Sequence, residues 1–372
     1  MHQVLLLGAG KIGRMIAWFL ARTGDYDVMV ADCDEKALTR IRNQSEVQTK
    51  QLDATNASEL QAIMHGRDSV ISGLSYRFNP LIAKVAVNEG LSYFDLTEDV
   101  ETTRKVRDIA GKTRTDRIVM PQCGLAPGFI SIVGNYLTKA FDSLDTVRMR
   151  VGALPQFPAN ALKYNLTWST DGLINEYCNP CEAIHDGRQI EILPLEGLEH
   201  FSLDGVRYEA FNTSGGLGTL CETMDGRVRE LNYKTIRYLG HRELMSFLVH
   251  ELQMNRKREM LKQILEEAVP LTFQDVVVVF CTITGHRKGQ LVQHSDARKI
   301  YSETIDNEAW SAIQITTAAG LCAALDMHVS EKLPLGGFVR QEDVDYEQFL
   351  ENRFGRYYNT EGSTRFSSMD CF

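Results

Sequence analysis

The feature that most constrains the fold is a glycine-rich turn near the N-terminus, GAGKIG at residues 8–13. It follows an apolar run (residues 4–8) typical of a buried strand and opens an amphipathic, helix-like stretch (residues 11–23). In this context the first glycine makes a tight turn, the second lets a pyrophosphate approach the backbone, and the third allows close helix–strand packing. The free N–H groups at the helix start favour an anion. The pattern predicts a dinucleotide-binding unit, and its expected cofactor contacts are Gly8, Gly10, Lys11, Ile12 and Gly13.

An acidic residue follows this turn near the spacing that ribose binding requires. Asp32 ends the next predicted strand, 24 residues after Gly8. A carboxylate there can accept hydrogen bonds from the ribose hydroxyls but would repel a 2′-phosphate. The residues after it, Cys33-Asp34-Glu35, supply no arginine. The sequence therefore favours NAD over NADP, with Asp32 and Cys33 beside the ribose.

Short apolar runs continue to alternate with amphipathic segments up to about residue 122, which predicts a parallel sheet with helices on both faces. Ligands of such sheets bind at the carboxyl ends of the strands. Asp53-Ala54 ends the third strand, where the aspartate either lies beside the adenine or is a solvated loop residue. The other candidates for cofactor contacts are Leu74 and Ser75, after the fourth strand, and Pro127 and Gly128, after the sixth.

Polar residues after the fifth strand are candidates for chemistry. The run 95–98, Asp-Leu-Thr-Glu, can lie at the reacting end of the substrate, which makes Asp95 a candidate catalytic base. The alternative is a capping role, with Thr97 as the N-cap of a helix over residues 98–110. The sequence leaves both interpretations open.

A second polar run, residues 234–241, combines cations, a phenol and an imidazole before a predicted helix. Arg237 can hold a carboxylate through two hydrogen bonds. His241 can act as an acid or base, or cap the helix. Glu222 and Thr223 lie in a loop just upstream, and Glu222 is a further candidate base.

Strands predominate from about residue 145 to 306, interrupted by one predicted helix over residues 241–268. A long, mostly buried helix is predicted over residues 308–329, where small residues suit close packing on a sheet. This change from alternating strands and helices to mostly strands indicates a second domain.

Charge and composition restrict the partners. The 372 residues carry a formal net charge of −9, which argues against nucleic acid or an anionic membrane as the main partner. No run approaches the ~18 consecutive apolar residues that a membrane span needs. Eight scattered cysteines and a strand-like N-terminus are typical of a cytoplasmic protein with reduced thiols. The pair Cys178 and Cys181 lacks the second pair of a structural zinc site, so we expect no metal.

Taken together, seven segments resemble the saccharopine dehydrogenase-like superfamily, and are most similar to its lysine ε-dehydrogenase (lysine 6-dehydrogenase) branch. They span nearly the whole chain, in order. The segments are GAGKIGRMIAWFL (8–20), CGLAPGF (123–129), TWSTDGLINEY (167–177), DGR (186–188), ETM (222–224), TIRYLGH (235–241) and TTAA (316–319).

The resemblance implies an α/β fold: a Rossmann doubly wound parallel sheet with an inserted mixed α/β domain for substrate binding and dimerisation. The NAD-binding domain would comprise residues 1–125 plus 307–350, and the inserted domain residues 126–306. Residues 360–372 are expected to form a disordered tail. The implied protein is a homodimer that acts on a small-molecule amino-acid substrate, with Trp168 and Ser169 in the pocket wall beside Arg237 and Thr223.

The implied reaction is NAD-dependent oxidation of a C–N bond, with lysine as the favoured substrate and Asp95, Glu222 or His241 as the base. The alternatives are reductive condensation of an aldehyde with an amine, as in saccharopine or carboxynorspermidine formation, and a non-catalytic NAD sensor. Two departures bear on the substrate. Ala126 stands where saccharopine reductases have an aspartate, and Leu239 stands where the family commonly has a proline.

Overall fold

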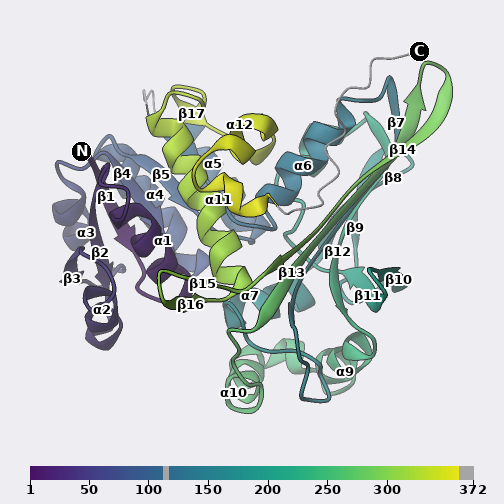
Figure 1. The fold of residues 1–372 in the computed structure, drawn as a ribbon, viewed down its shortest axis with the longest axis horizontal. Helices are drawn as coiled ribbons and strands as arrows, with labels where there is room; N and C mark the ends of the chain where they lie inside the picture. The colour runs from purple at the N-terminus through teal and green to yellow at the C-terminus, as the bar shows by residue number, and fades with distance from the viewer. Residues whose placement is uncertain (112–116, 360–372) are drawn as a thin grey trace.

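The computed structural model describes residues 1–111 and 117–359, so the predicted tail at 360–372 lies outside the described residues. Two β-sheets stand side by side, with the long helix α11 (Ala312–Val329) between them (Figure 1). The N-terminal segments form the first sheet and its helices. The long strands in the second half of the chain form the second sheet.

The first sheet is parallel, and within the described residues its strand order is β17-β6-β5-β4-β1-β2-β3. Apart from β17, this is the doubly wound order of dinucleotide-binding folds, so the predicted fold class is confirmed. Its strands are β1 (His2–Leu7), β2 (Tyr26–Asp32), β3 (Gln48–Gln51), β4 (Ser69–Ser72), β5 (Ser92–Asp95), β6 (Ile118–Met120) and β17 (Gly337–Phe338). Its helices are α1 (Lys11–Ala21), α2 (Glu35–Arg42), α3 (Ala57–Met64), α4 (Asn79–Asn88) and α5 (Val100–Gly111).

Strand β1 shows why the sheet is covered on both faces. Successive residues of a strand point to opposite faces. Val4 and Leu6 pack in a cluster with α1 and α11, whereas Leu5 and Leu7 pack in a second cluster with α3 and α4. An apolar run without alternation is therefore what a central parallel strand requires.

The second sheet is mixed, and its main strand order is β10-β11-β12-β7-β13-β14, with β8 and β9 at its side. Strands β7 and β12 are parallel, and the other pairs are antiparallel. Its strands are β7 (Ser143–Pro155), β8 (Cys181–His185), β9 (Arg188–Ile192), β10 (Glu199–Leu203), β11 (Val206–Asn212), β12 (Val228–Tyr238), β13 (Asp275–Arg287) and β14 (Gln290–Tyr301). Nearby helices are α6 (Phe129–Thr138), α7 (Thr170–Cys178) and α8 (Leu220–Met224).

The single helix predicted over 241–268 is wrong. The chain forms α9 (His241–Ser246), a π-helical turn (Phe247–Glu251), a short 3-10 turn and α10 (Arg258–Ala268). An unbroken helix of that length would extend about 40 Å. The break, at which Gln253 has a left-handed φ of 51°, folds α10 back so that its apolar face joins the cluster that α9 contacts.

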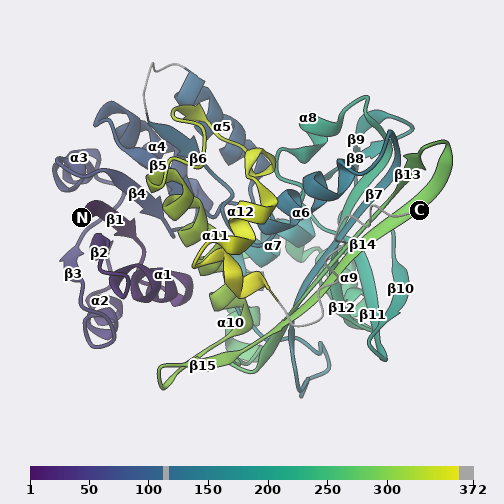
Figure 2. The same cartoon turned by 45° about the horizontal axis from the view of Figure 1, so that its top comes forward.

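Helix α11 is long and apolar enough to cross a membrane, contrary to our expectation for the sequence, but 83% of it is buried inside the protein. It packs against α1 on one side and against β13 on the other (Figure 2). Ser311 and Gln314 form a capping box at its N-terminus, and the buried carboxylate of Asp275 accepts hydrogen bonds from the first two N–H groups. Its burial identifies α11 as a core helix.

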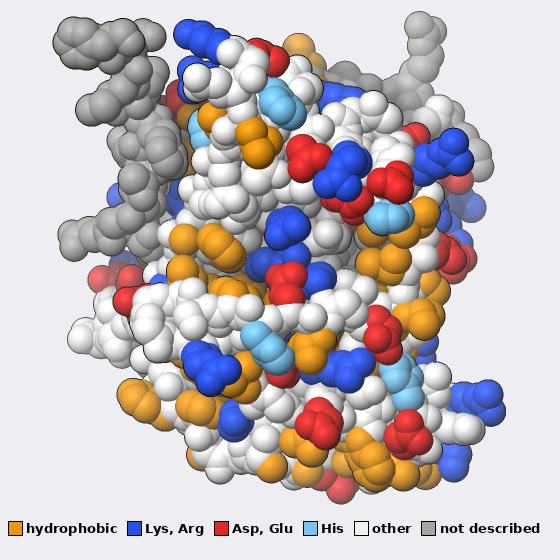
Figure 3. Space-filling model, turned by 90° about the vertical axis from the view of Figure 1, so that its right-hand side faces the viewer, with side chains coloured by type: hydrophobic (Ala, Val, Ile, Leu, Met, Phe, Trp, Pro, Cys, Tyr) orange, Lys and Arg blue, Asp and Glu red, His pale blue; other side chains and the backbone are white. Residues whose placement is uncertain are grey.

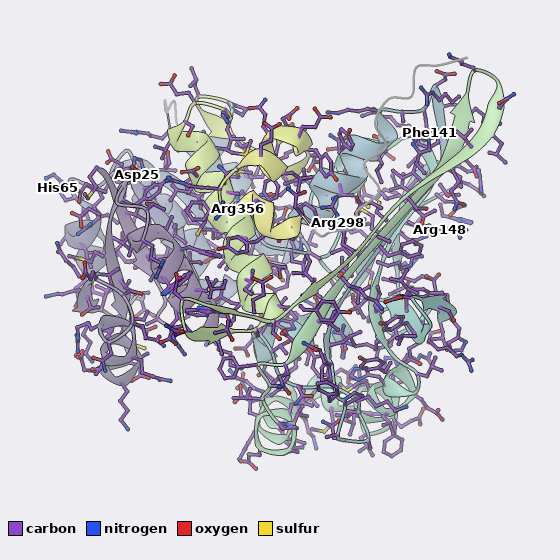
Figure 4. The ribbon with its side chains drawn as sticks, viewed as in Figure 1. Asp25, His65, Phe141, Arg148, Arg298 and Arg356 are labelled. Carbon is purple, nitrogen blue, oxygen red and sulfur yellow. The ribbon has the colours of Figure 1, made fainter. Side chains whose placement is uncertain are left out.

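The C-terminal segment ties the two sheets together. After α11, β17 pairs with β6 of the first sheet, and α12 (Tyr346–Glu351) follows. Arg353 pairs with Asp25 beside β2 at 2.5 Å, and Arg298 of β14 donates to the Tyr358 carbonyl at 2.6 Å. Asp25 and Arg298 are labelled in Figure 4 at the two ends of this connection. The hairpin of β15 (Glu303–Ile305) and β16 (Glu308–Trp310) precedes α11.

The outer side of the second sheet is hollowed, and Lys and Arg side chains gather in its centre (Figure 3). On this sheet, Arg150 and Lys234 both pair with Glu199. The seven cysteines within the described residues are free thiols, including the half-buried Cys178 and the buried Cys181.

Candidate active site

A cavity of about 310 Å³ lies between the carboxyl ends of the first sheet's strands and the inner face of the second sheet. Residues that follow β4, β5 and β6 form one wall, and β7, β12 and α7 form the other. Open α/β sheets bind ligands at this edge, so the cavity is the candidate active site. The residues used below that line it are Ile12, Leu74, Ser75, Glu98, Pro127, Trp168, Ser169, Asp171, Glu176, Tyr233, Thr235 and Arg237.

The glycine turn has the geometry that a dinucleotide needs. Gly8 has a φ of 110°, and a Cβ atom on Gly13 would lie 2.0 Å from the Gly8 carbonyl oxygen. The backbone geometry of the turn therefore requires glycine at both positions, whether or not a ligand is bound. A Cβ on Gly10 would meet no atom within 4 Å, and Gly10 precedes the first turn of α1. The open space there, at a helix N-terminus, fits a pyrophosphate.

The predicted ribose and adenine positions lie at the same edge. Asp32 is half-buried, and its carboxylate accepts hydrogen bonds from the N–H of Ala9 at 2.7 Å and of Asp34 at 2.8 Å. Each carboxylate oxygen retains a lone pair for a ribose hydroxyl. Cys33 is exposed next to it. Asp53 is exposed and forms a local turn with Thr55, whose backbone N–H holds the pKa of the aspartate below its ordinary value.

Four of the residues predicted to contact the cofactor lie on the cavity wall. Ile12, Leu74, Ser75 and Pro127 all line the cavity. Gly128 lies behind this wall as the N-cap of α6, where a Cβ would approach the Gly124 carbonyl oxygen to 2.0 Å. Lys11 reaches across to the second domain and donates to the Leu166 carbonyl at 3.1 Å, and Ala54 packs in the core beside α3.

Arg237 supplies the positive charge of the cavity. Its side chain extends from β12 and is only 3% exposed, so the guanidinium is out of bulk water. Its Nε donates to the Tyr177 hydroxyl, and its Nη1 donates to Thr235 Oγ1 and to the Ile236 carbonyl. Among the described residues, no carboxylate pairs with it and no hydrogen bond uses Nη2. A buried cation without an anion is costly, which indicates that an anionic ligand completes the site.

Of the three carboxyl groups that line the cavity, Asp171 pairs with Lys262 at 2.8 Å, and Glu98 and Glu176 remain beside this cation. Burial raises the pKa of the Glu176 carboxyl to about 8, against the opposing effect of Arg237. Burial likewise raises the pKa of Glu98 to about 7. Such values allow proton transfer near neutral pH, which an ordinary glutamate cannot perform as efficiently.

Helix α7 positions the wall around these carboxyl groups. Ser169 is its N-cap and accepts from the N–H of Gly172. A Cβ on Gly172 would lie 2.3 Å from the Trp168 ring and 3.2 Å from Glu98 Oε1, so the glycine allows both side chains to pack there. Glu176 lies one helical turn further along the same face.

The four other predicted polar residues do not line the cavity. Asp95 is fully buried and accepts from the Tyr93 hydroxyl and from the N–H groups of Thr97 and Gln122, which fixes the ends of β5 and β6. Glu222 pairs with Arg107, and Thr223 donates to Glu342 at 2.5 Å. His241 contacts the Tyr177 hydroxyl and the Leu162 carbonyl. Burial lowers the pKa of His241 to about 3, so it stays neutral at ordinary pH.

Sequence reasoning missed Glu176, and it named Glu98 only as part of a polar cluster. A signal for Glu176 was present, because Ser169, Gly172 and Glu176 are spaced three and four apart and therefore share one helix face. Nothing in the sequence placed that face opposite Arg237, which lies on a strand about 60 residues later.

Comparison with known proteins identifies the family of the chain. Residues 4–118 match the family described as saccharopine dehydrogenase NADP binding domain, and residues 124–354 match saccharopine dehydrogenase C-terminal domain. Alpha-aminoadipic semialdehyde synthase, mitochondrial, from Bos taurus is 22% identical over 363 residues, which cover 90% of this chain and 38% of the relative. Saccharopine dehydrogenase (NADP(+), L-glutamate-forming) from Saccharomyces cerevisiae is 23% identical over 326 residues, covering 82% and 69%.

A solved structure supports the fold assignment. Apo saccharopine dehydrogenase (L-Glu forming) from Saccharomyces cerevisiae superimposes with a TM-score of 0.77 at 18% identity, covering 94% of this chain and 97% of that one. The fold and the position of the cavity are those of a dinucleotide-binding α/β protein. The chain belongs to the saccharopine dehydrogenase family, although it spans only 38% of the length of its mammalian relatives.

Proposed function

We propose that the protein catalyses the NAD-dependent oxidative deamination of the ε-amine of lysine. The observation that carries the proposal is the content of one cavity: a buried guanidinium without an anion, and two carboxyl groups with raised pKa values, beside the nicotinamide end of the dinucleotide site. Lysine offers one carboxylate and two ammonium groups, which match this set in number and sign.

The positions of the residues suggest their roles. Arg237 binds the α-carboxylate of the substrate through Nη2. Glu176 is the carboxyl group whose charge interacts with Arg237, so it lies at the same end and binds the α-ammonium group. Glu98 follows β5 at the sheet edge and lies at the ε-amine end.

Proton transfer precedes the redox step. Glu98 accepts a proton from the ε-ammonium group, because only the neutral amine releases hydride readily. Bound at the glycine turn and Asp32, NAD would supply the acceptor for the hydride that leaves the ε-carbon. Water then adds to the resulting imine, the C–N bond breaks, and the products are an aldehyde, ammonia, the reduced cofactor and the released proton.

The charge of the cavity distinguishes this reaction from the condensation that forms saccharopine. The names of the relatives favour saccharopine, which carries three carboxylates. Among the described residues that line the cavity, Arg237 is the one cation. Three further cations of the second domain lie outside the lining: Lys163, Arg207 and Arg242. Lys163 and Arg242 donate to backbone carbonyl groups. Lysine therefore fits the charge better.

The assay that tests the proposal is direct. The purified protein is mixed with NAD and lysine at mildly alkaline pH, and the absorbance of the reduced cofactor is followed. In parallel, the reduced cofactor is supplied with candidate aldehydes and amines. Lysine oxidation supports the proposal. Condensation without lysine oxidation would assign the protein to the alternative reaction, and neither reaction would favour a nucleotide sensor.

We expect NAD to be preferred over NADP because of Asp32. Replacing Asp32 by Ser and Cys33 by Arg removes the repulsion of a 2′-phosphate and adds a cation for it. The double variant should shift the ratio of kcat/KM for NADP over NAD upward by at least tenfold. Single-site Cys33→Ser is the control and should leave the ratio unchanged. An unaltered ratio in the double variant would show that the ribose lies elsewhere.

We expect Glu176 to destabilise the folded protein at alkaline pH. Its pKa is about 8 when folded and near 4.5 when unfolded, so the folded state binds the proton more tightly. Stability is then lost as pH rises from about 4.5 to 8, by several kcal/mol at most (about 1.4 kcal/mol per pH unit). Glu176→Gln should therefore melt at a higher temperature than the parent at pH 9, with the difference vanishing near pH 4.5. Equal melting temperatures at pH 9 would contradict this environment for Glu176.

A further inference from the structure

A buried chain of hydrogen bonds lies behind Arg237, outside the cavity lining. Arg237 Nε donates to the Tyr177 hydroxyl at 2.9 Å, and that hydroxyl lies 2.9 Å from His241 Nε2. His241 Nδ1 lies 2.8 Å from the Leu162 carbonyl oxygen. Tyr177 and His241 are each 1% exposed, so water does not compete for these bonds.

The chemistry of the groups fixes the direction of every bond in this chain. An arginine has no acceptor, so Tyr177 must accept from Nε. The phenol proton is then free to be donated to His241 Nε2, which must be unprotonated. A carbonyl only accepts, so His241 Nδ1 carries the proton that reaches Leu162. All four groups are satisfied only when His241 is the neutral Nδ1–H tautomer.

The same chain leaves one end of Arg237 for a ligand. Nε is held by Tyr177, and Nη1 is held by Thr235 Oγ1 at 2.7 Å and by the Ile236 carbonyl at 2.9 Å. The ring of Tyr164 lies under the guanidinium, 4.8 Å from its carbon. The plane and rotation of the group are thereby fixed, and both N–H groups of Nη2 remain.

We propose that Tyr177 and His241 are positioning residues that hold Arg237 in the one orientation in which Nη2 faces the substrate carboxylate. The identity of that carboxylate rests on the proposed function. The positioning role rests on the geometry of the hydrogen-bond chain from Arg237 through Tyr177 and His241 to Leu162, which we call the relay. Because Leu162 begins the segment that leads to Trp168 and Ser169, His241 also ties this relay to the cavity wall.

The first test separates substrate binding from general damage. Tyr177→Phe removes one oxygen and should raise the KM for lysine about tenfold, the loss expected for one hydrogen bond to a charged group, with kcat within twofold. The slower oxidation of 1,5-diaminopentane, which lacks the carboxylate, should not change. Tyr238→Phe is the matched control, because Tyr238 follows Arg237 on β12 but its hydroxyl donates to the Pro155 carbonyl of β7. His241→Gln, which keeps an acceptor for Tyr177, should retain a lower KM than His241→Leu.

Equal losses with lysine and diaminopentane would overturn the positioning role. A second measurement needs no substrate: ¹⁵N NMR of the histidine rings, assigned with His241→Gln. We expect His241 to show the Nδ1–H tautomer unchanged from pH 5 to 9. The titratable groups that face its ring are Arg237, Tyr164 and Tyr177, and neither a cation nor a neutral phenol stabilises a protonated imidazole. Titration in this range, or a proton on Nε2, would overturn the relay. The expected signal in an enzyme that does not oxidise lysine would support the relay and reject the proposed function.

Discussion

Replacing Arg237 by Met should lower kcat/KM for lysine by about 10²–10³. The expected loss is about 3–4 kcal/mol, because one partner of a desolvated ion pair is removed and the substrate carboxylate enters the cavity without a cation. Steady-state kinetics with lysine measures the effect. Binding of NAD, followed by calorimetry, should be unchanged, since Arg237 lies on β12 and the glycine turn lies on the first sheet.

A conservative variant and a substrate without the carboxylate test whether Arg237 acts by binding that carboxylate. Arg237→Lys keeps the charge but loses the bonds that fix its direction, so it should be intermediate between the parent and Arg237→Met. With 1,5-diaminopentane the parent and the Met variant should differ little. A Met variant that oxidises lysine normally would remove Arg237 from the substrate site.

Replacing Glu98 by Gln should lower kcat by about 10²–10⁴, the usual contribution of a general base. In the parent protein, kcat/KM should rise with pH through about 7, because the Glu98 carboxyl must lose its proton before it can accept one from the substrate. This limb should be absent from the variant, whereas a limb at higher pH that belongs to the substrate ammonium should remain. The full pH profiles of both proteins check the prediction.

Glu176→Gln is the matched control for this experiment, because Glu176 also lines the cavity but, in the proposed binding mode, lies at the other end of the substrate. It should raise the KM for lysine more than it lowers kcat. If Glu98→Gln keeps the limb near pH 7, the base is another group. If both variants lose kcat equally, the two carboxyl groups act as a unit.

Much of the first domain could be predicted from sequence because its signals are local. The glycine turn, the apolar run of β1 and the position of Asp32 follow from short-range rules. The structure places the turn after the carboxyl end of β1 and Asp32 at the carboxyl end of the neighbouring β2. The break after α9 could not be predicted in this way. Propensity favours one long helix, and only packing of α10 on a distant cluster outweighs it.

The polar residues of the site show the same limit. Arg237 could be named from its chemistry, but Asp95 and His241 have the same chemistry as catalytic groups and are used in the interior instead. What distinguishes them from Glu98 and Glu176 is which side of a strand or helix faces the cavity. Which side faces the cavity depends on how the two sheets pack against each other, and no short sequence motif predicts that packing.

The central claim is that this cavity presents the ε-carbon of lysine to the nicotinamide of NAD. Lysine deuterated at both ε-hydrogens tests it most directly, with mass spectrometry of the reduced cofactor as the readout. One deuterium is expected in each molecule of reduced cofactor, and none when the label is at the α-carbon. Label transfer from the α-carbon, or no reduction of NAD by lysine at all, would contradict it.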